Sequence, residues 1–194
     1  MNFTTACNLL DAGGAHPSEG HCSEKQFNYL RDLVARCQQI KIVLEIGFNA
    51  GHSALAFLSA RSDVRVVSVE IGRYEYTLKG KAVVDQQFPG RHTLLIGNSL
   101  LLLPQMRELF KDFRADLAFV DGGHDFPVPG ADIHHCLQLL QPAGLLLVDD
   151  VCQHMVDVRR AVTEAVAAKR IREAEYVVDT PVQAWLLCYK SLQE

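Results

Sequence analysis

The feature that most constrains this chain is a repeated alternation between short aliphatic runs and longer amphipathic stretches. The runs are apolar at nearly every position instead of every second one, which is typical of strands buried on both faces of a parallel sheet. The stretches between them have the length and apolar spacing of helices. We therefore predict strands at residues 40–46, 64–70, 92–96, 116–121 and 144–149, and helices at about residues 23–37, 53–60, 74–87, 99–113, 131–140 and 153–168.

The end of the chain breaks this alternation. Residues 174–179 and 183–189 both have the pattern of strands, and only Thr180, Pro181 and Val182 separate them. With no helix between them, they form a hairpin-like pair in which one strand runs antiparallel to the others. The predicted fold is α/β: a doubly wound, Rossmann-like, seven-stranded, mostly parallel sheet with an antiparallel C-terminal strand and helices on both faces. Residues 1–22 are expected to form a flexible leader or short lid, and residues 23–194 a single domain.

Length and composition exclude several classes of protein. The chain has 194 residues, 48% of them hydrophobic and 22% charged, which suits one soluble domain with a sizeable core. A formal net charge of −4 leaves no broad basic field, so neither nucleic acid nor a membrane surface is an expected partner. No apolar run approaches the roughly 20 residues of a membrane-spanning helix, and we find no secretory signal. Six scattered cysteines without a C-x-x-C pair favour reduced thiols in a cytoplasmic protein.

Polar residues and glycines gather where the predicted strands end. Ligands of open α/β sheets bind beyond the carboxyl ends of the strands. Acidic residues stand at four of the five ends, which turn chemistry explains less well than a ligand site does. The clusters are Glu45 to Gly51, Glu70, Gly97 to Ser99, Asp121 to His124, and Asp149 with Asp150.

The loop after the first strand has the pattern Glu45-x-Gly47-x-x-x-Gly51, which differs from the dinucleotide motif G-x-G-x-x-G. The first glycine allows the backbone to approach a ligand, and the second allows the next helix to pack near the strand. An acid in this loop would repel a pyrophosphate but suits a ligand with a positive charge. Glu70 follows Gly47 by about 23 residues, close to the separation of about 20 at which an acid binds ribose hydroxyls.

Together these features resemble the class I S-adenosylmethionine-dependent methyltransferases, from about residue 23 to residue 189. The resemblance is carried by residues 43–53, 69–70, 97–99, 119–124 and 147–150. It implies S-adenosyl-L-methionine as the cofactor, with Glu45, Gly47 and Ser53 along its methionine part, Glu70 at the ribose, and Asn98 and Ser99 at the adenine. The implied cofactor-binding set is completed by Phe48, Asn49, Gly51, Ile71 and Asp121.

Within this class the sequence is closer to the cation-dependent O-methyltransferases of the catechol and caffeoyl-CoA type. In those families an Asp after the fourth strand and an Asp-Asn pair after the fifth bind a divalent metal, and the matching residues are Asp121, Asp149 and Asp150. Asp150 replaces an Asn of those families, and His124 replaces a catalytic Lys. The arrangement of Asp121-x-x-His124 with Asp149-Asp150 is more similar to the macrolide-sugar O-methyltransferases, in which the acids hold magnesium and the His is the base.

The implied reaction is methyl transfer to a hydroxyl group of a small molecule. A hydroxyl is a poor nucleophile at neutral pH, and coordination to a metal lowers its pKa. Three carboxylates suit a hard ion such as Mg²⁺, whereas the lack of Cys or paired His at the centre of the cluster argues against zinc. His124 is the candidate base, because an imidazole titrates near neutral pH, and Asp121 is the other predicted catalytic residue.

Several alternatives stay open. Asp149 and Asp150 could cap the following helix, and His124 could be a loop histidine bonded to the backbone. We expect Asp132 on a solvent-exposed helix face, and Trp185 and Tyr189 in the core. The chain could also be a metal-independent methyltransferase, a non-catalytic S-adenosylmethionine-binding regulatory module, or a nicotinamide-dependent dehydrogenase, although the acidic loop and the terminal strand pair count against the last. The resemblance makes a homodimer an expected assembly, while the identity of the acceptor has no short-motif signature.

Overall fold

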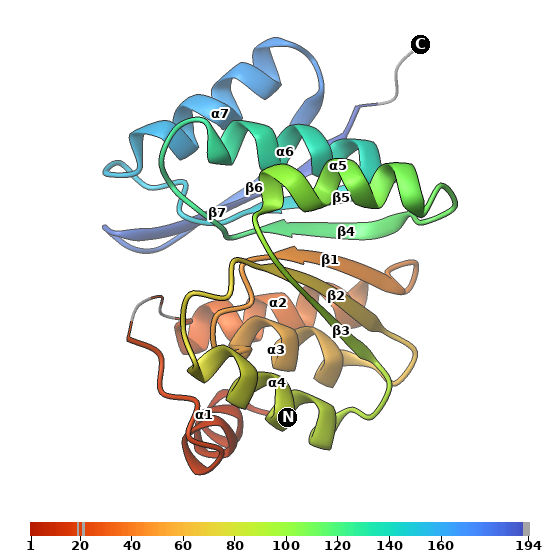
Figure 1. Ribbon diagram of the computed structural model, residues 1–194. Coiled ribbons are helices and arrows are strands. Elements are labelled where there is room, and N and C mark those ends of the chain that lie inside the picture. Colours follow the sequence, from red (N-terminus) through yellow and green to blue (C-terminus); the bar gives the residue numbers. More distant parts are fainter. Residues whose placement is uncertain (19, 21, 192–194) are drawn as a thin grey trace. The chain divides into compact units, whose positions relative to one another are not determined.

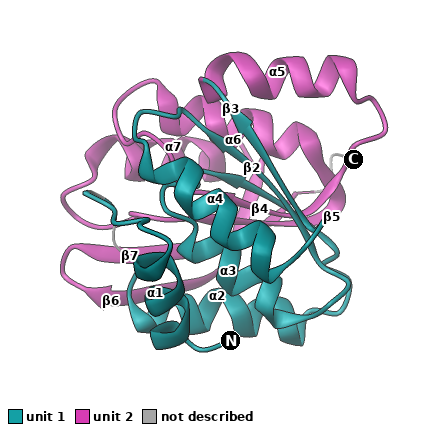
Figure 2. Ribbon diagram, turned by 60° about the horizontal axis from the view of Figure 1, so that its bottom comes forward, with its two compact units in different colours: residues 1–97 teal, residues 98–194 magenta. Residues whose placement is uncertain are grey.

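The computed structural model (Figure 1) describes residues 1–18, 20 and 22–191. The contacts group the chain into two compact units, residues 1–97 and residues 98–194 (Figure 2). Within the described residues, no helix combines the length and the apolar character that crossing a membrane requires. Because strands and helices alternate through both units, each one contains a part of the predicted α/β fold.

The first unit contains three parallel strands and four helices. β2 (Arg65–Glu70) lies between β1 (Ile42–Ile46) and β3 (His92–Ile96), with Val67 opposite both Leu44 and Thr93. Apart from the first helix, the elements agree with the predicted ranges to within about two residues. The helices are α1 (Phe3–Ala12), α2 (Glu24–Arg36), α3 (His52–Ala60) and α4 (Tyr76–Gln87).

The second unit contains four strands and three helices, α5 (Ser99–Leu109), α6 (Val128–Leu139) and α7 (Val156–Ala167). β4 (Ala115–Val120) pairs in parallel with β5 (Leu140–Val148), while β7 (Gln183–Lys190) runs antiparallel to both β5 and β6 (Ile171–Thr180). β7 is therefore the predicted reversed strand, and it lies beside β6 in Figure 1. β5 begins earlier than predicted, because Leu140 already pairs with Ala115 before the register shifts. Pro142 and Gly144 lie in this first part of the strand, and neither is typical of a strand interior.

Helix α1 lies in the segment that the sequence analysis treats as a flexible leader without a helix. Asn2 caps it by accepting a hydrogen bond from the backbone N–H of Thr5 at 2.8 Å. Ala6 and Leu10 are buried, and the ring of Phe3 meets that of Phe27 on α2 edge-on at 5.8 Å. The sequence analysis did not predict this helix, although Ala6 and Leu10 stand four residues apart, as on one face of a helix. Whether the rest of residues 1–22 acts as a lid stays a prediction.

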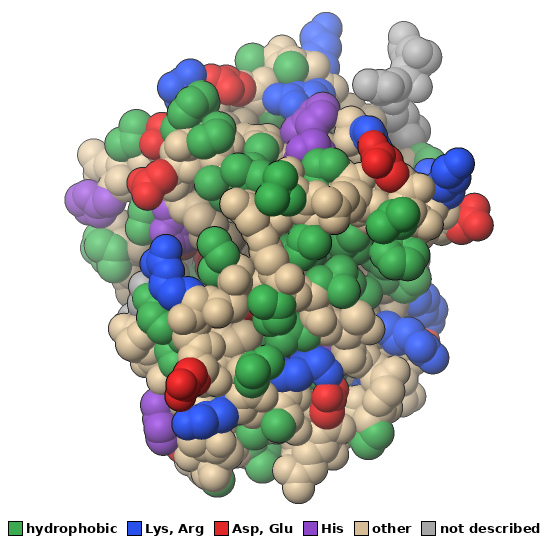
Figure 3. Space-filling view, in the orientation of Figure 1, with side chains coloured by type: hydrophobic (Ala, Val, Ile, Leu, Met, Phe, Trp, Pro, Cys, Tyr) green, Lys and Arg blue, Asp and Glu red, His purple; other side chains and the backbone are tan. Residues whose placement is uncertain are grey.

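Helix α5 exposes two large apolar side chains. Leu103 and Met106 are buried, whereas Leu101 and Leu109 are 63% and 74% exposed. Phe110, which follows the helix, is 56% exposed. Figure 3 shows hydrophobic side chains at the surface over this helix. Large exposed apolar side chains that gather on one element mark a candidate contact surface.

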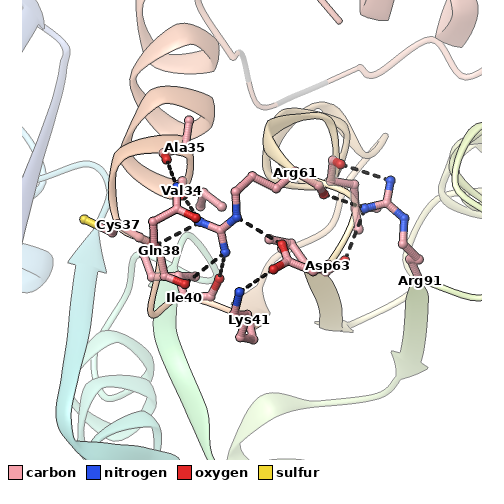
Figure 4. Close-up of polar contacts among 11 residues, drawn as sticks. Val34, Ala35, Cys37, Gln38, Ile40, Lys41, Arg61, Asp63 and Arg91 are labelled. Carbon is pink, nitrogen blue, oxygen red and sulfur yellow. Dashed lines mark hydrogen bonds and ion pairs between the residues drawn. The ribbon is translucent and has the colours of Figure 1, made fainter.

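Two arginines hold the first unit together at the amino ends of its strands (Figure 4). The guanidinium of Arg61 donates to the carbonyl oxygens of Val34 and Cys37 at 2.5 and 3.0 Å, and also to those of Gln38 and Ile40. Arg91 in turn donates to the carbonyl oxygen of Arg61 at 2.7 Å. The last carbonyls of a helix have no partner within the helix. These arginines therefore satisfy oxygens where α2 and α3 end.

Candidate active site

The loop that joins β1 to α3, residues 47–51, is the glycine loop of this structure. Three of its residues have left-handed backbone angles: Gly47 at φ 93°, Asn49 at φ 51° and Gly51 at φ 99°. A Cβ at Gly51 would lie 2.8 Å from the Phe48 ring, so this position needs glycine for both reasons. On α4, a Cβ at Gly80 would lie 2.1 Å from the carbonyl oxygen of Ala50, so that helix backbone packs directly against the loop.

Glu70, at the end of β2, is hydrogen-bonded to the backbone of the glycine loop. Its Oε2 accepts hydrogen bonds from the backbone N–H groups of Phe48 at 3.0 Å and Asn49 at 2.9 Å. Its Oε1 accepts one from the N–H of Gly72 at 3.0 Å. An ionised carboxylate offers about four acceptor positions. Glu70 can therefore accept one further hydrogen bond at Oε1, beside Ile71, whose side chain is 59% exposed.

Glu45 is completely buried at the end of β1. The hydroxyl of Ser53 donates to Oε1 at 2.5 Å, and the hydroxyl of Ser68 donates to Oε2. Burial raises the pKa of Glu45 to about 7, against the lowering effect of the two hydroxyls, and the nearby charge of Glu70 raises it slightly. Since Glu45 has no exposed surface, it acts on the loop through Ser53, the residue predicted with it along the methionine part of the cofactor.

In the second unit, Asn98 and Ser99 open helix α5. The Asn98 side chain caps the helix, and its Oδ1 accepts a hydrogen bond from the N–H of Leu100 at 2.9 Å. Asp132 on α6 is fully buried, so its expected position on a solvent-exposed face is wrong. Burial raises its pKa to about 6, against a lowering effect of Ser99. Both oxygens of its carboxylate are buried without a hydrogen-bond partner among the described residues.

Asp121, His124 and Asp150 form the acid–histidine cluster of the second unit. One potential ligand atom from each of the three lies within 4.8 Å of the others. His124 Nε2 lies 2.8 Å from Asp150 Oδ2, and this hydrogen bond is the main cause that raises the pKa of His124 above its ordinary value. His124 is 43% exposed and Asp150 19% exposed, so the cluster is open to solvent on the histidine side.

The backbone after β5 explains why Asp150, and not Asp149, belongs to this cluster. The N–H of Asp149 donates to the carbonyl of Val120 at 2.9 Å, which continues the ladder between β5 and β4. Asp150 then has a left-handed φ of 57°, and its side chain turns toward His124. Asp149 is 6% exposed and lies outside the cluster. Of the predicted metal ligands Asp121, Asp149 and Asp150, the structure brings together the first and the last and adds His124.

The terminal strands contribute residues that the sequence analysis did not identify. The phenol of Tyr176 on β6 donates to the carbonyl oxygen of Val151 at 2.9 Å, directly after the acidic pair. Trp185 on β7 is 1% exposed, as expected for the core. Tyr189 is 44% exposed, so its expected place in the core is wrong, and the guanidinium of Arg172 lies 4.9 Å from its ring centre. Alternation along a strand carries no information on such contacts between strands.

Parallel strands, a glycine loop and an acid at the end of the second strand define a Rossmann-like cofactor-binding fold. Residues 44–151, which include the glycine loop, Glu70 and the acid–histidine cluster, match the family described as "Methyltransferase domain". This match spans more than half of the chain. The chain belongs to that methyltransferase family, which confirms the resemblance to S-adenosylmethionine-dependent methyltransferases.

One curated relative is the O-methyltransferase imqG of Aspergillus flavus. It is 26% identical over 125 residues, which cover 61% of this chain and 49% of the relative. The chain therefore spans about half the length of the curated relative that it matches.

Solved structures share the fold along nearly the whole chain. An O-methyltransferase from Bacillus cereus in complex with SAH has a TM-score of 0.82 and 20% identity, over 97% of this chain and 91% of that one. The O-methyltransferase TomG from Streptomyces achromogenes in complex with SAM has a TM-score of 0.78 and 20% identity, over 97% and 89% of the two chains. These similarities confirm the predicted mostly parallel α/β fold with its reversed C-terminal strand.

Proposed function

We propose that this chain is an S-adenosylmethionine-dependent O-methyltransferase that transfers a methyl group to a hydroxyl group of a small molecule. The observation that carries the proposal is the acid–histidine cluster at the ends of β4 and β5, in a chain of the methyltransferase family. Proteins of similar fold have been solved with SAM or SAH, and imqG is named an O-methyltransferase. Chemistry at an oxygen acceptor needs a group that removes a proton, and His124 is such a group.

The glycine loop is the proposed site for the methionine part of the cofactor. Helix α3 begins directly after Gly51, which provides no side-chain cap for its first N–H groups. The amino end of a helix favours negative charge, so it suits the carboxylate of S-adenosylmethionine. The remaining acceptor position of Glu70 and the exposed side chain of Ile71 suit a ribose hydroxyl and an adenine edge. Asn98, Ser99 and Asp121 complete the proposed set.

The acid–histidine cluster fits a divalent cation by its donor atoms. Carboxylates are ordinary ligands of Mg²⁺ and Mn²⁺, whereas an imidazole suits softer metals, so Asp121 and Asp150 fit these ions better than His124 does. Asp121 and Asp150 would hold the ion, and Asp149 would support them from the buried side. When bound, the ion lowers the pKa of the acceptor hydroxyl. His124 receives the hydroxyl proton as the oxygen bonds to the methyl carbon and the carbon–sulfur bond breaks, which leaves S-adenosylhomocysteine.

A metal-independent reaction is the second candidate, and one observation favours it. His124 Nε2 lies 2.8 Å from Asp150 Oδ2, so the carboxylate can orient the imidazole and stabilise its protonated form without an ion. Pairs of this kind activate hydroxyl nucleophiles in enzymes that contain no metal. In that case Asp150 is a partner of the base and not a ligand.

A methyl-acceptor screen separates these possibilities. The purified chain is incubated with S-adenosylmethionine and small hydroxylated acceptors, with Mg²⁺ or with EDTA, and S-adenosylhomocysteine is quantified by mass spectrometry. Turnover that needs Mg²⁺ and is lost in Asp121→Asn, but kept in the exposed control Asp112→Asn, supports the metal-assisted reaction. Turnover in EDTA supports the metal-independent one. Binding of S-adenosylhomocysteine without turnover on any acceptor supports the regulatory module and contradicts both enzymatic proposals.

The expected homodimer and cytoplasmic location belong to the same proposal. The exposed side chains Leu101, Leu109 and Phe110 give the second copy a place to bind. Light scattering on the wild type and on Leu109→Lys tests this, since a charge at that contact should shift a dimer toward monomer. A wild type that is monomeric at all concentrations would contradict the expected assembly.

A further inference from the structure

Three neighbouring strands in the first unit contribute to one buried hydrogen-bond chain. Glu45 on β1 lies opposite Ser68 on β2, and His92 on β3 has the same side-chain direction two positions away. The hydroxyl of Ser68 is bonded to Glu45 Oε2 and lies 2.9 Å from His92 Nε2. Glu45 and Ser68 are fully buried, and His92 is 7% exposed. Burial makes each of these hydrogen bonds costly to lose.

The number of hydrogens on these groups determines which group donates in each hydrogen bond of this series. Ser53 and Ser68 both donate to the ionised Glu45, so the single hydroxyl hydrogen of Ser68 is used. His92 must then donate its Nε2–H to the Ser68 oxygen. Its Nδ1 is buried and has no hydrogen-bond partner in the described part of the chain, which suits a bare nitrogen better than an N–H. Burial, together with Lys81, lowers the pKa of His92 to about 4 against the raising effect of Asp85, so the ring is neutral.

The same histidine supports the glycine loop by contact. The rings of Phe48 and His92 stack with centres 4.9 Å apart and planes 21° from parallel. Phe48 is 1% exposed, and its N–H is held by Glu70. Its ring also fills the space beside Gly51. His92 is therefore connected to the loop region in two ways. One is the series of hydrogen bonds through Ser68 and Glu45 to Ser53, in the first turn of α3. The other is the stacking of its ring on Phe48.

We propose that Ser68 and His92 are positioning residues of the cofactor site. Ser68 holds Glu45 aligned with Ser53, and His92 supports Ser68 and packs against Phe48 of the glycine loop. This inference rests on the proposed function, because it assumes that the loop binds S-adenosylmethionine and S-adenosylhomocysteine. Neither residue belongs to the predicted site, and both are buried, so they act through Glu45 and Phe48 and not by contact with the cofactor.

The buried hydrogen-bond chain should make cofactor binding depend on pH, which a role in packing alone would not do. Protonated Glu45 can no longer accept from both hydroxyls, so the loop loses one of its supports as pH falls below about 7. The other charged groups that face this chain are Glu70 at the end of β2 and Lys81 with Asp85 on α4. We expect the affinity for S-adenosylhomocysteine to fall as pH is lowered through this range.

Calorimetric titration with S-adenosylhomocysteine between pH 5.5 and 8.5 tests the proposal on Ser68→Ala, Ser68→Thr and Ser59→Ala. Ser59 is the matched control, because its hydroxyl bonds only to the carbonyl of Ala56 in its own helix. Ser68→Ala should weaken binding about tenfold at pH 8, since it removes a hydrogen bond to a charged group. It should also move the midpoint of the pH dependence upward, because that hydroxyl lowers the pKa of Glu45. Ser68→Thr keeps the hydroxyl and should restore both.

His92→Phe separates the two contacts, because it keeps a ring against Phe48 but removes the Nε2–H. It should weaken binding less than Ser68→Ala does. Equal affinity and an unchanged midpoint in Ser68→Ala and wild type would overturn the proposal. A loss in Ser59→Ala as large as that in Ser68→Ala would show general loosening and would overturn it as well.

A second measurement keeps this inference distinct from the proposed function. Nitrogen-15 NMR of the histidine ring should show His92 neutral with its proton on Nε2 at about pH 8, where Glu45 is ionised. If the wild type fails to bind S-adenosylhomocysteine while His92 has this tautomer, the cofactor proposal is wrong, but the buried hydrogen bonds among Glu45, Ser68 and His92 are confirmed. A ring with its proton on Nδ1 would contradict the buried chain whatever the protein binds.

Discussion

The phenol of Tyr176 donates a hydrogen bond to the carbonyl oxygen of Val151 at 2.9 Å. The N–H of Val151 donates to the carbonyl of Ala184 on β7 at the same distance, so two terminal strands hold the residue that follows Asp150. Asp150 has a left-handed backbone, a conformation that is uncommon outside glycine but that Asp and Asn adopt more often than most residues. The strands that end the fold therefore fix the direction in which this carboxylate meets His124.

Tyr176→Phe should reduce turnover while leaving cofactor binding intact. The change removes one neutral hydrogen bond of about 1 kcal/mol, so we expect roughly a fivefold loss of kcat from a less well aligned Asp150. Tyr189→Phe is the matched control, since this tyrosine is exposed on β7 beside Arg172. Steady-state kinetics and titration with S-adenosylhomocysteine measure the two effects. Equal kcat in Tyr176→Phe and Tyr189→Phe would show that the phenol has no part in alignment.

Asp150→Asn should lower the pKa of His124 in the metal-free protein. The hydrogen bond to Asp150 is the largest cause that raises this pKa, and Asp149 contributes only through its charge. Asp149→Asn should therefore shift the pKa less, in the same direction. Proton NMR of the His124 ring against pH measures both, and activity should fall by about a hundredfold in Asp150→Asn if this pair is the general base. A larger shift in Asp149→Asn would reverse the assignment of the two acids.

The buried pair Glu45 and His92 predicts a stability profile with opposing slopes. The folded pKa of Glu45 is raised to about 7, so its share of stability falls as pH rises from about 4.5 to 7. The folded pKa of His92 is lowered to about 4, so its share rises with pH between about 4 and 6.5. Glu45→Gln should make the free energy of unfolding rise more steeply with pH, and His92→Phe should make it rise less or fall. Urea unfolding at several pH values measures these slopes, and slopes that change in the same direction in both variants would contradict the two assignments.

Arg61→Ala should destabilise the chain without touching the site. The guanidinium is mostly buried and bonds to carbonyls at the end of α2 and to Asp63 (Figure 4), so its loss leaves several acceptors unsatisfied, at about 2–4 kcal/mol. Arg61→Lys should recover only part of this, because an ammonium lacks the planar set of donors. Arg65→Ala, at an exposed position on β2, is the control. Urea denaturation compares the three, and a loss in Arg65→Ala equal to that in Arg61→Ala would refute the capping role.

The elements that the sequence predicted best are those whose pattern is local. β3 begins and ends at the predicted residues, because its short apolar run ends at a glycine, although only His92 of this strand is buried. The glycine loop was equally evident, since glycines occupy two of its three left-handed positions. Helix α1 was missed although its buried residues Ala6 and Leu10 have helical spacing, because the Gly, Pro and polar residues that follow it favoured the interpretation as a leader.

The candidate site shows the same division. The acids at the strand ends, Glu45, Glu70, Asp121, Asp149 and Asp150, were all identified from the sequence. Their roles differ by burial and by direction, because neighbouring residues at a strand end point to different sides. Asp150 faces His124, whereas Asp149 is buried and lies outside the cluster. Adjacent letters in a sequence carry no information on that difference.

The sequence by itself therefore determined the alternating fold, the glycine loop and the positions where acids end strands, because each depends on residues close together in the chain. Only the tertiary structure decided that Ser68 and His92 support Glu45, that Asp132 is buried, and that Tyr176 holds the turn at Asp150. These partners lie on different strands and helices. Strand register and burial bring them together, and both arise only when the strands and helices have packed.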